Sequence, residues 1–168
     1  MEVKGAALLY TLATLMITFA GFAALLLIIR QTAGVGLSAL DRFLARTVVG
    51  HFSWTAASAL FPSILSLYDL PEPWIWKVSA LLFGLPLLAL LLSFQHRRFA
   101  ATGKHAPPIV TAVFVGVGSL SIVAMIAYIF GNFEHPAAAY ATALTVIFLT
   151  HAFAFVIALE VILSQQTK

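Results

Sequence analysis

Three ionisable side chains, His51, His151 and Glu160, fall inside long apolar stretches of this 168-residue sequence. A charge in hydrocarbon is costly, so an ionisable residue in such a stretch marks a candidate functional site. An imidazole can exchange a proton near neutral pH, bind a metal or form a hydrogen bond. Proton transfer, ligand binding and structural hydrogen bonding are therefore the chemistries open to the two histidines.

His151 lies near the middle of the last and longest apolar stretch. We favour a core histidine that hydrogen-bonds a hydroxyl group at the same depth, and Ser58 is the expected partner. The functional alternative makes His151 a proton relay, a polar constriction or a ligand contact. His151 and Ser58 thus form the candidate polar site within the apolar region.

A second polar cluster is expected at the basic end of the apolar region. His51 and Glu160 each lie about one helical turn from that end of their own stretch, and Arg46 is close by in sequence. A pair of His51 with Glu160 is possible at this depth, and Arg46, Arg97 or Arg98 could equally reach Glu160. For Glu160 we favour a structural ion pair or a carboxylate that extends to the interface. Glu160 and His151 are nine positions apart, about 13 Å along a helix and on opposite faces, so they do not share a site.

Haem binding is an alternative that depends on the relative depth of the histidines. Axial ligation by two histidines requires both at one depth on facing helices. Counted from the ends of their stretches, His51 and His151 differ in depth by several turns, and His96, His105 and His135 fall in loops. The absence of cysteine excludes thiolate metal sites. We expect no metal or other cofactor, and haem stays an alternative.

The elements that carry these residues are five apolar stretches, each of the roughly 20 residues or more that cross a hydrocarbon core of about 30 Å. The composition agrees, because 62% of the residues are hydrophobic and 9% are charged, against about 25% charged in soluble domains. Backbone groups in lipid must bond to each other, so each stretch should be a helix. The sequence predicts an all-α, five-helix integral-membrane bundle, one domain over residues 1–168, with spans at 6–29, 47–68, 74–94, 109–130 and 136–163.

The charges between the spans predict the orientation of the bundle. Seven of the nine positive residues fall on one side: Arg30, Arg42, Arg46, Arg97, Arg98, Lys104 and Lys168. The other side has Lys4 and Lys77 together with acidic residues that include Asp69, Glu72 and Glu134. The positive-inside rule then places the N-terminus outside and the C-terminus in the cytoplasm, and we expect a bacterial inner-membrane protein. A net charge of +3, scattered over the chain, does not indicate a nucleic-acid partner.

Two basic segments are expected to lie at the cytoplasmic interface. Ser38 and Asp41 resemble a capping box, which predicts a short amphipathic helix over 38–46 before the second span. The segment 96–108 is predicted to be a basic loop. Basic side chains there are expected to contact lipid headgroups, at about 1 kcal/mol each; they are Arg42, Arg46, Arg97, Arg98 and Lys104.

Small and hydroxyl-bearing residues predict the faces that pack together, because close approach drives helix association in lipid. The predicted inward stripes are Thr11, Thr14, Thr18 and Gly21; Thr47, His51, Thr55, Ser58 and Pro62; and Ala112 and Gly116, followed by Gly118, Ser119 and Ser121. Tyr and Trp side chains favour the membrane interface, and six of them are predicted near the outer boundary: Tyr10, Tyr68, Trp74, Trp76, Tyr128 and Tyr140.

The sequence has no motif of a hydrolase, a metalloprotease or a nucleotide-binding protein. We therefore expect a non-enzymatic membrane protein that associates with itself or serves as an accessory subunit of a membrane complex, with lipids and other membrane subunits as partners. One alternative is a small oligomeric channel or transporter whose polar path is lined by His151 and the Thr/Ser stripes. A haem-binding membrane subunit is the other alternative.

Overall fold

The computed structural model describes residues 5–32, 34 and 36–164, with side chains up to residue 157. In this part of the chain every regular element is a helix. Five helical segments are long and apolar enough to cross a membrane, which confirms the all-α prediction and indicates a multi-pass membrane protein. The elements are α1 (Ala6–Thr32), α2 (Ala39–Leu65), the 3₁₀-helix η1 (Ser66–Tyr68), α3 (Glu72–Leu92), α4 (Phe94–Thr102), α5 (Pro108–Thr111), the π-helix η2 (Ala112–Val117), α6 (Gly118–Phe130) and α7 (Pro136–Ser164).

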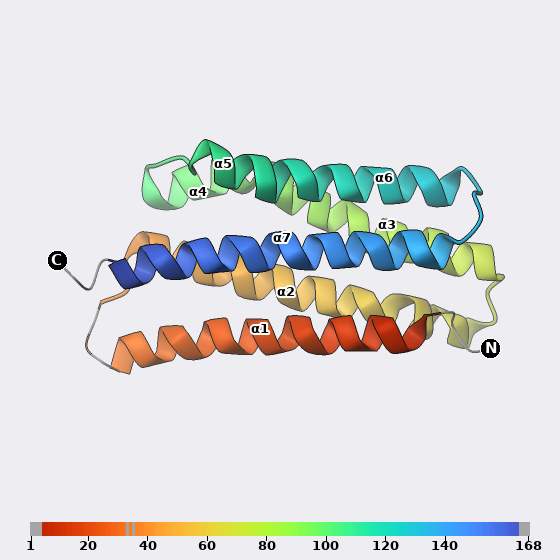
Figure 1. Cartoon of the computed structure of the whole chain (residues 1–168), viewed down its shortest axis with the longest axis horizontal. Coiled ribbons are helices and arrows are strands. Elements are labelled where there is room, and N and C mark those ends of the chain that lie inside the picture. Colours follow the sequence, from red (N-terminus) through yellow and green to blue (C-terminus); the bar gives the residue numbers. More distant parts are fainter. Residues whose placement is uncertain (1–4, 33, 35, 165–168) are drawn as a thin grey trace.

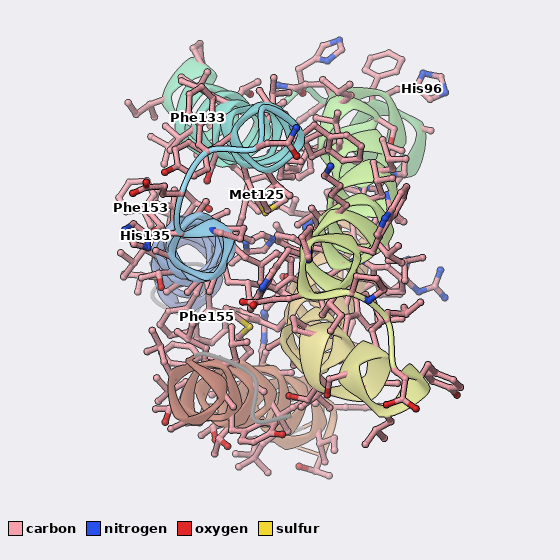
Figure 2. All side chains as sticks on the ribbon, turned by 90° about the vertical axis from the view of Figure 1, so that its right-hand side faces the viewer. His96, Met125, Phe133, His135, Phe153 and Phe155 are labelled. Atoms are coloured by element: carbon pink, nitrogen blue, oxygen red, sulfur yellow. The ribbon has the colours of Figure 1, made fainter. Side chains whose placement is uncertain are left out.

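The long helices lie side by side in two layers (Figures 1 and 2). Seen end-on, α6, α7 and α1 form one layer, and α3 and α2 form the other. Helix α7 packs against α1, α2, α3 and α6, so it is the central helix of the bundle. The start of α1 and the end of α7 lie at opposite ends (Figure 1). We call the end where α1 finishes and α2 begins the basic end, and the opposite one the acidic end.

Helix α2 begins earlier than the sequence predicted. The Ser38 capping box is confirmed, because the Ser38 hydroxyl accepts from the Asp41 amide and the Asp41 carboxylate accepts from the Ser38 amide. The helix that follows runs without interruption to Leu65. The prediction of a helix over 38–46 that leads into the second span is therefore confirmed from Ala39, but this helix and the span are one continuous element rather than two. A position at the membrane interface stays a prediction.

The segment after the third span is also more regular than expected. Residues Phe94–Thr102 form α4, which ends at Gly103 in the left-handed conformation with φ of 68°. Glycine adopts this conformation without steric cost, which suits a helix end. The predicted loop thus contains a helix that carries Arg97 and Arg98 at the basic end.

A buried ion pair joins α1 to α2 at the basic end. Arg30, in the last turn of α1, lies 3.3 Å from Asp41, in the first turn of α2, and the two side chains are 10% and 3% exposed. Each charge also has the favourable sign for its helix end. The pair holds the two helices together across their connecting segment.

The predicted inward stripe is correct for α2 but wrong for α1. All five residues of the α2 stripe are buried, whereas Thr11, Thr14, Thr18 and Gly21 are not part of the buried face of α1. Each of these threonine hydroxyls donates to the carbonyl four residues earlier, at 2.8–2.9 Å. The hydroxyls are therefore satisfied within their own helix on its exposed face. Apolar side chains occupy the inward face; they are Leu9, Leu12, Met16, Ala20 and Ala23.

The start of the fourth span and two of the aromatic residues also differ from expectation. Ala112 and Gly116 are not buried, whereas Gly118, which was also predicted to face inward, is buried. Trp76 and Tyr140 are completely buried and lie 5.8 Å apart between ring centroids, so they are core residues rather than interface anchors. The other four aromatic side chains are exposed, as an interface position requires.

Candidate functional site

The centre of the bundle holds a pair of histidines in direct contact. Nδ1 of His51 on α2 lies 2.9 Å from Nε2 of His151 on α7, and both residues are 2% exposed. The predicted difference in depth between them was wrong. Because α2 starts at Ala39, His51 lies near the middle of a 27-residue helix, and His151 lies near the middle of the 29-residue helix α7.

The hydrogen bonds of the pair have a defined direction. Nδ1 of His151 lies 2.6 Å from the carbonyl oxygen of Ile147. A carbonyl oxygen only accepts, so this nitrogen carries the proton, and Nε2 of a neutral His151 accepts from Nδ1–H of His51. Nε2 of a neutral His51 is then an acceptor, and it is buried without a hydrogen-bond partner among the described residues. A group that meets this nitrogen must therefore be an O–H or N–H donor.

Aromatic rings enclose both imidazoles. Phe114 stacks on His51 with an angle of 9° between the planes and meets the edge of His151, at centroid distances of 5.4 Å and 5.0 Å. Phe52 lies 5.7 Å from His151. Phe114 comes from the π-helix η2, whose wider turn changes which side chains face inward. The enclosure keeps the pair in a medium of low dielectric, where a satisfied hydrogen bond is strong.

Ser58 is not the partner of His151. Its hydroxyl donates to the carbonyl of Trp54 at 2.8 Å, and its own carbonyl accepts from the Tyr140 hydroxyl, also at 2.8 Å. Ser58 lies seven residues after His51, about 10 Å further along α2. His151, at the depth of His51, is therefore out of its reach, and Ser58 instead takes part in a contact between α2 and α7.

The predicted cluster of His51, Arg46 and Glu160 is described only in part. Glu160 lies on α7, and its side chain is outside the described residues. His51 and Arg46 line one open groove of about 490 Å³ between α2 and α3, with α4 at one end. Two of the remaining histidines, His96 and His135, lie at the edge of the bundle in Figure 2. By contrast, the side chains of Met125 and Phe155 point into the bundle.

The groove ends in two arginines at the basic end of the bundle. Arg97 is held in place by hydrogen bonds from Nη2 to the Leu90 carbonyl at 2.7 Å and from Nε to the Ser93 hydroxyl at 3.1 Å. Partial burial lowers the pKa of the Arg97 guanidinium, but arginine stays charged in proteins. Arg46 lines the same groove. The charged side chains along the groove are therefore both positive.

The other predicted headgroup contacts lie outside this groove. Arg98, whose pKa is likewise lowered by partial burial, lines a second cavity of about 90 Å³ together with His151 and Phe114. Arg42 donates to the Leu37 carbonyl at 2.7 Å, and Lys104 is exposed. All five predicted basic residues thus lie at one end of the bundle, and two of them share the groove with His51.

The histidine pair meets one geometric condition for haem but not the others. The two residues lie at one depth on facing helices, contrary to the sequence-based expectation. However, metal–imidazole bonds of about 2 Å would require about 4 Å between the ligating nitrogens, and the observed distance is 2.9 Å. Phe114 also occupies the space beside both rings. As they are placed, these residues do not fit a haem between the two histidines.

Comparison of the chain with protein-family models, with curated proteins and with solved structures finds no match. Among the described residues, no group of three or more His, Cys, Asp or Glu side chains is placed to hold a metal ion. The chemical interpretation of the site therefore depends on its own geometry.

Proposed function

We propose that this chain is a non-enzymatic integral membrane subunit that associates with itself or with other membrane proteins. The observation that supports this proposal best is the enclosed His51–His151 hydrogen bond. Both nitrogens of His151 are engaged, and aromatic rings cover the pair. A polar contact of this kind between facing helices fixes their register, as interhelical hydrogen bonds do in membranes.

The core between the histidine pair and the acidic end also favours a structural part for the pair. Trp76, Phe83 and Tyr140 are completely buried there, and the Tyr140 hydroxyl bonds to the backbone of α2. These large side chains fill the core of this half of the bundle. The histidine pair therefore has a packed core between itself and the acidic end. With short connections between the described helices, the apolar exterior is the surface through which partners would bind.

A small channel or transporter is the second candidate function. The supporting observation is the buried Nε2 of His51, which lacks a partner in the described part of the chain and belongs to a residue of the open groove. An open groove lined by a histidine at mid-helix would supply half of a proton path if water filled it. The two arginines in the groove disfavour cations, which weighs against this candidate.

The experiment that separates the two candidates combines assembly and flux. We expect the tagged protein, extracted in mild detergent, to be a particle that contains more than one 18.1 kDa chain or further polypeptides. We also expect vesicles that contain it to hold a pH gradient as long as protein-free vesicles do. A single-chain particle in both detergent and lipid nanodiscs would contradict the subunit proposal.

Substitution of the pair makes the flux measurement specific. If wild-type vesicles dissipate the gradient and His151→Phe abolishes this while the particle mass stays the same, the transporter replaces the subunit as the proposed function. The double variant His51→Phe/His151→Phe is measured in parallel, because it removes the pair without leaving one unpaired imidazole in the core.

A further inference from the structure

We propose that the groove between α2 and α3 is a specific binding site for an anionic phospholipid of the surrounding bilayer. The lipid phosphate would bind to Arg46 and Arg97, and one acyl chain would lie along the groove against Trp54, Pro86 and Leu90. This inference does not rest on the subunit proposal, since the groove is formed by this chain alone and needs no partner polypeptide; His51 lines it, but the His51–His151 hydrogen bond is not part of the binding argument.

The shape of the groove fits a lipid rather than a small soluble ion. From Arg46 to Trp54 the α2 wall extends about 12 Å, and the volume of about 490 Å³ is large enough for a chain segment. Gly50 and Ala89, which line the groove, are exposed, so it opens toward the hydrocarbon. The groove has apolar walls along its length and two arginines at one end. It therefore matches a lipid whose acyl chain lies parallel to the helices and whose headgroup lies at the basic end.

The basic end of the groove is arranged for an anion. The Arg97 guanidinium is oriented by Leu90 and Ser93, which reduces the rotamer entropy lost when a phosphate binds. Both charged residues along the groove are arginines, and their mutual repulsion falls when an anion lies between them. Arg42 and Lys104 are equally basic but do not line the groove, so they attract headgroups without selecting a site.

Trp54 allows occupancy of the groove to be measured directly. In a Trp74→Phe background, the protein is placed in phosphatidylcholine vesicles that contain brominated phosphatidylglycerol or, for comparison, brominated phosphatidylcholine. Bromine on an acyl chain quenches only nearby indoles. Trp76 is completely buried and gives a constant background, and the Trp54→Phe variant defines that background.

We expect brominated phosphatidylglycerol to quench Trp54 at a several-fold lower fraction in the bilayer than brominated phosphatidylcholine does. Arg46→Gln and Arg97→Gln should each weaken this preference about fivefold. Gly50→Leu should also remove it, because a Cβ at Gly50 has no atom within 4 Å and the new side chain would fill the groove. Arg42→Gln and Ala57→Leu, outside the groove, are the matched controls and should keep the preference.

Several outcomes would overturn the proposal. Equal quenching by the two lipids in the unsubstituted groove would show that no anionic lipid is selected. A preference that survives Gly50→Leu would reflect general attraction of the basic end for headgroups. Loss of the preference on adding excess inorganic phosphate would show that the arginines bind the free anion and that the acyl chain adds nothing.

Discussion

At the residue scale, the His51–His151 contact joins α2 and α7 by a hydrogen bond whose direction is set by the Ile147 carbonyl. This carbonyl assigns the proton on His151 and thereby the roles of all four imidazole nitrogens. One nitrogen remains, Nε2 of His51, as an acceptor in a residue that lines an open groove. The pair therefore combines a satisfied contact on one side with an unsatisfied acceptor on the other.

A double-mutant cycle on the pair tests its energetic coupling. His51→Phe or His151→Phe alone leaves one buried imidazole without its partner, and we expect each to lower the free energy of unfolding by about 1–3 kcal/mol. The double variant should cost less than the sum, with a coupling of about 0.6 kcal/mol and at most about 1.7 kcal/mol, the average and the maximum for hydrogen bonds between membrane helices. Unfolding in mixed micelles measures these values. Additive effects would show that the two rings do not interact.

At the element scale, the start of α2 combines a helix cap with an ion pair. Asp41 closes the capping box with Ser38 and also pairs with Arg30 of α1, so one carboxylate stabilises both the helix start and the contact with the preceding helix. The threonines on the outer face of α1 likewise bond to their own helix and need no partner from the core. Local hydrogen bonds thus satisfy polar side chains at a helix start and on an exposed helix face without a partner from another helix.

Substitutions at the start of α2 separate the two parts played by Asp41. Ser38→Ala removes the cap alone and should cost about 1 kcal/mol. Asp41→Ala also leaves the buried Arg30 charge without its carboxylate, and we expect a loss of about 3 kcal/mol or more. Arg42→Ala, at a neighbouring position outside the ion pair, is the control and should change stability by less than about 0.5 kcal/mol. Equal effects of Ser38→Ala and Asp41→Ala would mean that the ion pair contributes nothing.

At the scale of the whole molecule, the bundle has one basic and one acidic end. Arg46, Arg97, Arg98 and Lys104 lie at the first, and the turn with Glu134 lies at the second. This asymmetry is the feature that sets orientation in membranes. We propose accordingly that the basic end faces the cytoplasm.

Single cysteines can test this orientation without background, because the chain has no cysteine of its own. Glu134→Cys and Lys104→Cys both replace exposed residues in turns on either side of the α5–α6 segment. A membrane-impermeant maleimide should label Glu134→Cys in intact cells. It should label Lys104→Cys only after the membrane is opened. The reverse pattern would invert the orientation, and equal labelling of both would contradict a crossing between them.

The sequence by itself determined the number and approximate bounds of the apolar helices, the Ser38 cap and the segregation of charge. These features depend on local composition and spacing, since a length of apolar residues and a cap residue act within one helix. It also singled out His51 and His151, because an ionisable residue in an apolar stretch is conspicuous without any partner.

Only the tertiary structure decided which of these residues meet. The pairing of His51 with His151 follows from the uninterrupted start of α2 at Ala39, which shifts His51 to mid-helix, and from the contact of α2 with α7. The Ser38 capping box indicated that a helix begins at Ala39. The same residues were compatible with a short helix that is separate from the second span, so the sequence did not show that the helix is continuous. Packing between helices likewise buries Tyr140 and Trp76 and leaves the α1 threonines on the exposed face. The sequence of one helix does not show which of its faces will contact another helix.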